Sequence, residues 1–133
     1  MVTPNYMHAP GARAALAAGK PCSCEKPIAG TVDDAREMVE AAKAGNVKTF
    51  VWFNYRRCPD AHIIGYEHGF TNQAYDILRV LAGEEPTVPI PDFNDAYQTQ
   101  RVLEASLLSA AERRPVLLEE VKRKAANRTY RRH

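Results

Sequence analysis

The feature that most constrains the fold is a short apolar run at residues 50–53, Phe-Val-Trp-Phe, with polar residues on either side. A strand that faces water on one side alternates polar and apolar residues. A continuous apolar run instead suits a strand that is buried on both faces, as in a parallel sheet covered by helices. The sequence therefore favours an α/β protein with a parallel sheet.

A helix is predicted immediately before this run. Thr31 begins a capping box with Asp34, which marks a helix start, and Gly45 marks its end. Apolar residues between them recur at helical spacing and form one face: Ala35, Met38, Val39 and Ala42.

The same order of elements occurs once more, nearer the N-terminus. An alanine-rich helix is expected from His8 to Ala18, with Gly19 at its C-terminal end, and a short extended segment from Lys20 to Cys24 follows. Alternating helices and strands are typical of doubly wound folds. We therefore predict a partial Rossmann-like unit with two or three parallel strands.

The second half is expected to be mainly helical. A helical apolar stripe ends at Gly83 and comprises Phe70, Ala74, Ile77, Leu78 and Leu81. After a proline-rich connector, Asp92 is expected to cap a long helix that buries Ala96, Leu103 and Leu107. Residues 116–118 are expected to form a short edge strand, and residues 122–133 a basic tail.

Composition narrows the classes of partner and the cellular setting. A length of 133 residues suits one domain, and a net charge of +2 is too small to imply a polyanionic partner. No apolar run approaches the ~20 residues of a membrane span, and no signal peptide is recognisable. Cys22 and Cys24 are too close for an ordinary bridge, so we expect reduced thiols and a cytoplasmic protein.

The sequence gives only weak support to a metal site or to nucleic-acid binding. The three cysteines with His62 and His68 match no zinc-site spacing, so no metal is expected. The basic tail could bind nucleic acid, but Tyr130 is its only aromatic residue, so a solvated chain end is the preferred interpretation.

Two stretches carry residues suited to chemistry. Thr3-Pro4-Asn5, followed by His8, and Glu25-Lys26-Pro27 each come after a predicted strand. Ligands of open α/β sheets bind outside the carboxyl ends of the strands, so both stretches are expected at one crevice. A lysine there can hydrogen-bond a substrate hydroxyl and stabilise charge that develops on its oxygen. Taken alone, Lys26 would more often be a surface lysine, and His8 an ordinary helix-start histidine.

The order of these motifs resembles a known family. The segment from Val2 to about Pro59 carries, in order, Thr-Pro-Asn-x-x-His, Ala-Gly-Lys, Cys-Glu-Lys-Pro and Phe-Asn-Tyr-Arg-Arg. This segment looks like the Gfo/Idh/MocA family. The similarity resumes from about Ile64 with Gly-Tyr-Glu-His, Asn-Gln-Ala and Gln-Arg-Val-Leu-Glu-Ala. Members are NAD(P)-dependent dehydrogenases and reductases that act largely on sugars and cyclitols.

The resemblance implies NAD or NADP as cofactor, a sugar-like substrate, and Lys26 as the catalytic residue beside the nicotinamide. The implied cofactor-binding residues are Thr3, Pro4, Asn5, His8, Glu25, Lys26, Pro27, Asn54 and Arg56. It also implies a division of the chain into the second half of a nucleotide-binding domain (1–59), a C-terminal helical segment (60–121) and the tail (122–133).

The chain departs from the family pattern in two places. It contains no G-x-G-x-x-G, and the family's Asp- and His-bearing segment is missing between about Cys58 and Ile64. We therefore expect a family member truncated at its N-terminus and internally deleted, weakly active or inactive alone. The alternative is a non-catalytic interaction module that pairs with a copy of itself or with a complementing chain, because an incomplete sheet exposes edges.

Overall fold

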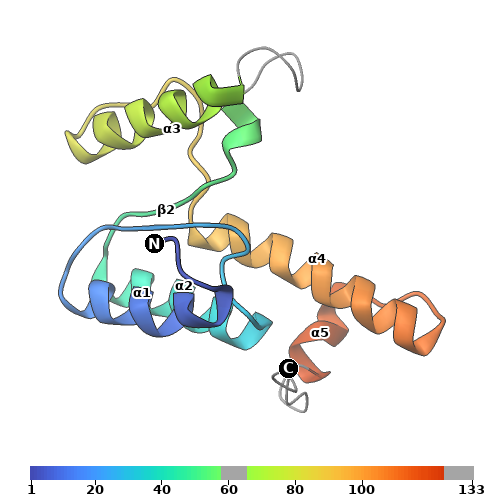
Figure 1. Cartoon of the computed structure of the whole chain (residues 1–133). Helices are drawn as coiled ribbons and strands as arrows, with labels where there is room; N and C mark the ends of the chain where they lie inside the picture. The colour runs from blue at the N-terminus through green and yellow to red at the C-terminus, as the bar shows by residue number, and fades with distance from the viewer. Residues whose placement is uncertain (58–65, 125–133) are drawn as a thin grey trace.

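The computed structural model describes residues 1–57 and 66–124 (Figure 1). The elements are, in order, η1 (Asn5–Met7), α1 (His8–Ala17), β1 (Cys22–Cys24), α2 (Val32–Gly45), β2 (Thr49–Val51), η2 (Asn54–Arg57), α3 (Tyr66–Leu81), α4 (Phe93–Glu112) and α5 (Leu118–Lys124).

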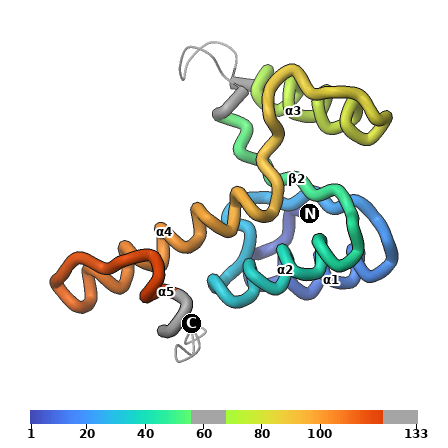
Figure 2. Tube along the Cα trace, turned by 180° about the vertical axis from the view of Figure 1, so that it is seen from behind, coloured from blue at the N-terminus to red at the C-terminus, as the bar shows by residue number. Residues whose placement is uncertain are grey.

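Strands β1 and β2 form a parallel sheet, as the sequence predicted. Their register places Cys22 opposite Thr49 and Cys24 opposite Val51. Helices α1 and α2 lie side by side below the strands in both views (Figures 1 and 2), so they cover the same side of the sheet. This arrangement is a partial Rossmann fold, which confirms the predicted fold class.

Backbone groups outside the two strands extend the pairing on both sides. The carbonyl oxygen of Met1 accepts from the amide of Glu25 at 3.0 Å, beside the end of β1. On the other side, the amide of Val51 donates to the carbonyl oxygen of Pro91 at 2.9 Å. Both edges of the sheet are therefore partly covered by neighbouring segments of the same chain.

Helix α2 forms as predicted. The hydroxyl of Thr31 accepts from the amide of Asp34 at 3.1 Å and donates to its carboxylate at 2.8 Å. The four residues of the predicted stripe are all buried. The helix ends at Gly45, and Asn46, with φ of 48°, is the residue that adopts the left-handed conformation after it.

The apolar run at 50–53 is only partly a strand. Phe50 and Val51 lie in β2 and are buried, whereas Trp52 and Phe53 follow the strand and are half-buried. The indole of Trp52 lies against the ring of Phe70, with 6.1 Å between the ring centroids. The second half of the run therefore faces α3 and is not part of the sheet.

Helix α3 buries a different face from the one predicted. Phe70, Leu78 and Leu81 are 39%, 66% and 44% exposed, and Ile77 is the buried member of the predicted stripe. Two polar residues of α3, Gln73 and Asp76, are buried instead. Each can be buried because its side chain hydrogen-bonds to a backbone group of another segment. Gln73 Nε2 donates to the carbonyl oxygen of Val51, and Asp76 accepts from the amide and hydroxyl of Thr87.

Helix α4 begins as predicted but buries other residues than expected. Asp92 accepts from the amide of Asp95 at 2.9 Å, and Ala96 is buried. The prediction was wrong for Leu103 and Leu107, which are half exposed. The start of α4 packs on α2 and its later turns pack on α5, so the buried positions are Phe93, Ala96, Tyr97, Glu104, Ala105 and Leu108.

The predicted edge strand at 116–118 is wrong. Helix α5 begins at Leu118, and the amide of Leu117 donates to the side chain of Glu120 at 3.0 Å, which caps the helix start. No strand of the described residues lies next to this segment to pair with it, and its residues instead lead into the first turn of α5. Residues 125–133 of the predicted tail lie outside the described residues.

Candidate functional site

The candidate crevice lies where the two strands end. Strand β1 ends at Cys24 and β2 at Val51, and the amide of Trp52 donates to the carbonyl oxygen of Cys24 at 3.0 Å. The segment from Glu25 to Pro27 therefore leaves the sheet beside the segment that leads to Asn54. This edge is the usual ligand-binding end of an open parallel sheet.

His8 is buried beneath this edge and is 1% exposed. Its Nε2 lies 2.7 Å from the carbonyl oxygen of Thr3, and its Nδ1 lies 3.0 Å from the carbonyl oxygen of Pro27. Carbonyl oxygens only accept, so an imidazole N–H is the donor in each bond that forms. His8 thus joins the two stretches that the sequence singled out.

Lys26 is exposed and follows β1 by two residues. Its backbone amide donates to the carboxylate of Glu25 at 3.3 Å, and the Lys26–Pro27 peptide bond is cis. Among residues 1–57 and 66–124, the ammonium of Lys26 makes no hydrogen bond or ion pair. This cation is therefore available to a ligand at the crevice.

The remaining predicted site residues lie around the same edge. Thr3, Pro4 and Asn5 are exposed and lead into η1, while Asn54 is buried at the start of η2. Arg56 lies in η2, but its side chain is outside the described part of the molecule. Contact of these residues with a nucleotide stays a prediction.

The sequence did not reveal the part that Gln73 plays at this edge. Its fully buried amide reaches the last carbonyl of β2 from a helix 22 residues further along the chain. A lone glutamine in a helix has no motif around it, so only a polar residue on the buried side of α3 could have signalled this contact.

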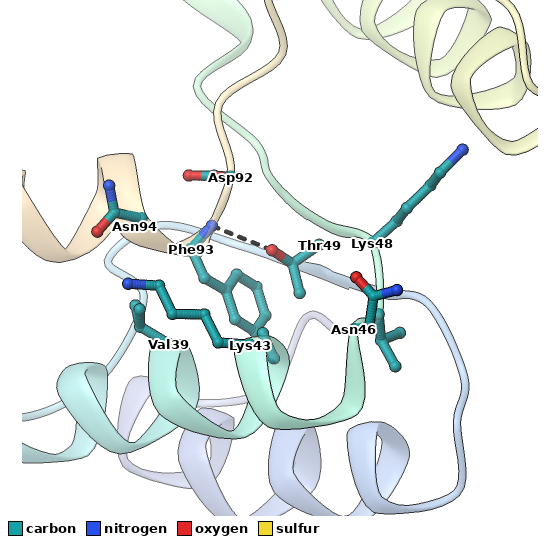
Figure 3. A pocket seen from close by; sticks show the side chains of 10 residues that line it. Val39, Lys43, Asn46, Lys48, Thr49, Asp92, Phe93 and Asn94 are labelled. Atoms are coloured by element: carbon teal, nitrogen blue, oxygen red, sulfur yellow. Dashed lines mark hydrogen bonds between the residues drawn. The ribbon is translucent and has the colours of Figure 1, made fainter.

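A pocket of about 370 Å³ lies elsewhere, between α2 and the start of α4 (Figure 3). It sits at the amino end of β2, beside Lys48 and Thr49, away from the candidate crevice. The first amides of α4 already have partners there, because Phe93 donates to the hydroxyl of Thr49 at 3.2 Å and Asp92 caps the helix. The start of α4 therefore offers few free backbone donors to an anion in this pocket.

The cysteines of the sheet are not suited to nucleophilic chemistry. Burial, and then the nearby Cys22 thiol, raises the pKa of Cys24 to about 12, and burial also raises the pKa of Cys22. Both therefore remain protonated thiols near neutral pH. No group of three or more metal-ligating side chains occurs in the described ranges; Cys58 and His62 lie outside them.

None of the helices within 1–57 and 66–124 is long and apolar enough to span a membrane.

Comparison with known proteins finds a family model that matches the segment carrying most of this site, and several partial relatives. The model of the Gfo/Idh/MocA family, described as an oxidoreductase family with an NAD-binding Rossmann fold, matches residues 1–53. Levoglucosan dehydrogenase of Pseudarthrobacter phenanthrenivorans is 48% identical over 59 residues, which is 44% of this chain and 15% of that protein.

Two further relatives show the same partial coverage. Inositol 2-dehydrogenase of Agrobacterium fabrum is 39% identical over 77 residues, 57% of this chain and 23% of that protein. A 1,5-anhydro-D-fructose reductase of Ensifer adhaerens is 51% identical over 45 residues, 34% of this chain and 14% of that protein. The chain thus spans less than a quarter of the length of each relative. Residues 1–53 belong to the NAD-binding Rossmann domain of the Gfo/Idh/MocA oxidoreductase family, of which this chain holds one part.

Proposed function

We propose that the crevice at the ends of β1 and β2 is the nicotinamide side of an NAD(P) site, and that Lys26 donates a hydrogen bond to the reacting oxygen of a sugar- or cyclitol-like substrate. The observation that carries this proposal is the exposed ammonium of Lys26, which has no partner among the described residues and lies two residues after the end of β1. The names of the three relatives, which act on levoglucosan, inositol and anhydrofructose, support this substrate class.

The residues present fit the nicotinamide end of such a ligand better than its phosphate end. The exposed lysine and the loop carbonyls suit a carboxamide and a substrate hydroxyl. None of the seven glycines forms a G-x-G-x-x-G turn, so this sequence supplies no such cradle for a pyrophosphate. We therefore expect weak nucleotide binding and little or no turnover by the chain alone.

The proposed reaction is a two-electron oxidation of an alcohol, or its reverse. NAD(P)⁺, when bound, supplies the acceptor for the hydride that leaves the alcohol carbon as its C–H bond breaks. The hydroxyl proton passes to solvent or a base, and a C=O bond forms. Lys26 holds the oxygen and stabilises the negative charge that develops on it.

Thermal unfolding followed by circular dichroism, with and without millimolar NADH or NADPH, tests binding. A ligand that binds only the folded protein raises the midpoint. We expect a small rise that Lys26→Ala removes and Lys20→Ala, an exposed lysine before β1, retains. Nucleotide oxidation with polyols and sugars would then be measured. A midpoint unmoved by either nucleotide, or a rise that survives Lys26→Ala, would refute the proposal.

A second candidate function is that of a non-catalytic module that pairs with another chain. It is favoured by the exposed apolar side chains of α3, of which Leu78 is the most exposed. Light scattering coupled to size-exclusion chromatography tests self-association: a dimer is expected that Leu78→Glu dissociates. A monomer at every accessible concentration would contradict pairing with itself.

We also infer a reducing, cytoplasmic setting. Cys22 and Cys24 are both buried, unbridged thiols on one face of β1, which supports this inference.

A further inference from the structure

We propose that His8 is a positioning residue for Lys26: its buried imidazole joins the carbonyl oxygens of Thr3 and Pro27, and so fixes the loop from which Lys26 projects. The functional consequence rests on the proposed role of Lys26, whereas the joining of the two loops does not. This role differs from direct contact with a cofactor, which the sequence suggested for His8.

The burial of His8 argues for an indirect role. The side chain is 1% exposed, and both ring nitrogens lie within 3.0 Å of backbone carbonyl oxygens. Neither nitrogen is therefore left for a ligand in the crevice. His8 can influence a ligand there only through the segments that it holds.

The two segments have few other connections to each other. At their base, the amide of Glu25 donates to the carbonyl oxygen of Met1. Beyond that bond, no backbone hydrogen bond joins residues 2–5 to residues 26–30 in the described structure. The segments do approach closely, since a Cβ added at Gly30 would lie 3.6 Å from the Cα of Tyr6. His8 thus supplies the side-chain contacts that bridge the two segments at this approach.

The anchor lies one residue from Lys26. The ring of Pro27 fixes its own φ near about −65°, so few torsions remain between the carbonyl held by His8 and the Cα of Lys26. Holding that carbonyl therefore restricts where the exposed ammonium can reach. Loss of the anchor would let the loop sample more conformations and would lower the fraction that presents Lys26 to the crevice.

Hydrogen exchange measured by mass spectrometry tests the joining of the loops directly. His8→Phe replaces the imidazole with another ring but removes both ring nitrogens, and we expect exchange of the amides in 2–7 and 25–30 to rise by about tenfold or more together. His8→Gln retains one amide donor and should restore part of the protection. Leu16→Ala, a buried change on the same helix, should not expose these two segments selectively.

Nucleotide-induced shifts of the unfolding midpoint test the consequence for Lys26. Since Lys26→Ala is expected to remove the rise, the informative variant is His8→Phe with Lys26 intact: if His8 positions Lys26, this variant gives a smaller shift than wild type, and His8→Gln restores part of it. A shift of wild-type size in His8→Phe, when Lys26→Ala removes it, would overturn the positioning role. The joining of the two loops would be overturned if, in both His8→Phe and His8→Gln, one of the two segments exchanged at the wild-type rate. This test stands even if no nucleotide binds and the proposed function has failed.

Discussion

The side-chain amide of Gln73 donates to the carbonyl oxygen of Val51 at 2.6 Å, which attaches α3 to the last residue of β2. The amide of Val51 donates in turn to Pro91, in the connector that leads to α4. Both contacts come from the second half of the chain. The first bond helps to hold α3 at the end of β2, and the second holds the connector beside the same strand (Figure 1).

The single tryptophan reports on this attachment. Trp52 is half-buried against Phe70, one residue after the bonded carbonyl. Gln73→Leu and Phe70→Ala should each expose the indole and shift its fluorescence emission to longer wavelength. Tyr75→Ala, at an exposed position of α3, should leave the emission unchanged. Identical spectra for all three variants would show that α3 is held by other contacts.

Phe93 should be a main support of the packing between α4 and the Rossmann unit. The ring is buried in the core at the first turn of α4. We expect Phe93→Ala to lower the free energy of unfolding by about 3–5 kcal/mol, because it removes buried area and leaves a cavity. Leu103→Ala, at a half-exposed position of the same helix, should change it by less than about 0.5 kcal/mol. Urea unfolding measures both, and equal effects would contradict the packing described.

The cap of α2 should contribute measurably to stability. The hydroxyl of Thr31 accepts a hydrogen bond from one otherwise unpaired amide at the helix start. Thr31→Ala should therefore lower the free energy of unfolding by about 1 kcal/mol. Thr31→Ser keeps the hydroxyl and should restore most of the loss. The free energy of unfolding in urea is the measurement; a serine variant as unstable as the alanine variant would assign the effect to the methyl group.

Cys24 should make stability depend on pH in the alkaline range. Its pKa rises from an ordinary value of 9.0 to about 12 on folding, chiefly through burial. Below pH 9 the thiol is protonated in both states, so it adds no pH dependence. Between pH 9 and 12 only the unfolded thiol ionises, so the free energy of unfolding falls as pH rises, by at most about 1.4 kcal/mol per unit.

The contribution of Cys24 is isolated by comparison with Cys24→Ala. Tyrosines and lysines also titrate in this range, but they are common to both proteins. The difference in unfolding free energy between wild type and Cys24→Ala should be constant below pH 9 and shift in favour of the variant above it. A difference independent of pH up to 12 would show that the thiol ionises equally in both states.

Local sequence signals predicted the first half well. The cap at Thr31 and the stripe on α2 depend on neighbours within one or two turns, so the chain itself encodes them. The Glu-Lys-Pro stretch could also be placed at a strand end, because β1 and the helix after it are both recognisable locally. The links through His8 could not be foreseen, because Thr3 and Pro27 meet it only after the strands have paired.

The second half shows where this reasoning stops. Periodicity showed that α3 and α4 each have an apolar stripe, but not what lies against it. Leu78 and Leu103 remain in solvent because the described chain places Gln73 and Phe93, and not those leucines, against neighbouring segments. The sequence by itself determined the helices, their caps and the parallel sheet, which follow from local hydrogen bonding and the burial of one face. Tertiary structure alone decided which faces are covered and which residues hold the loop that carries Lys26, because these depend on contacts between residues far apart in the chain.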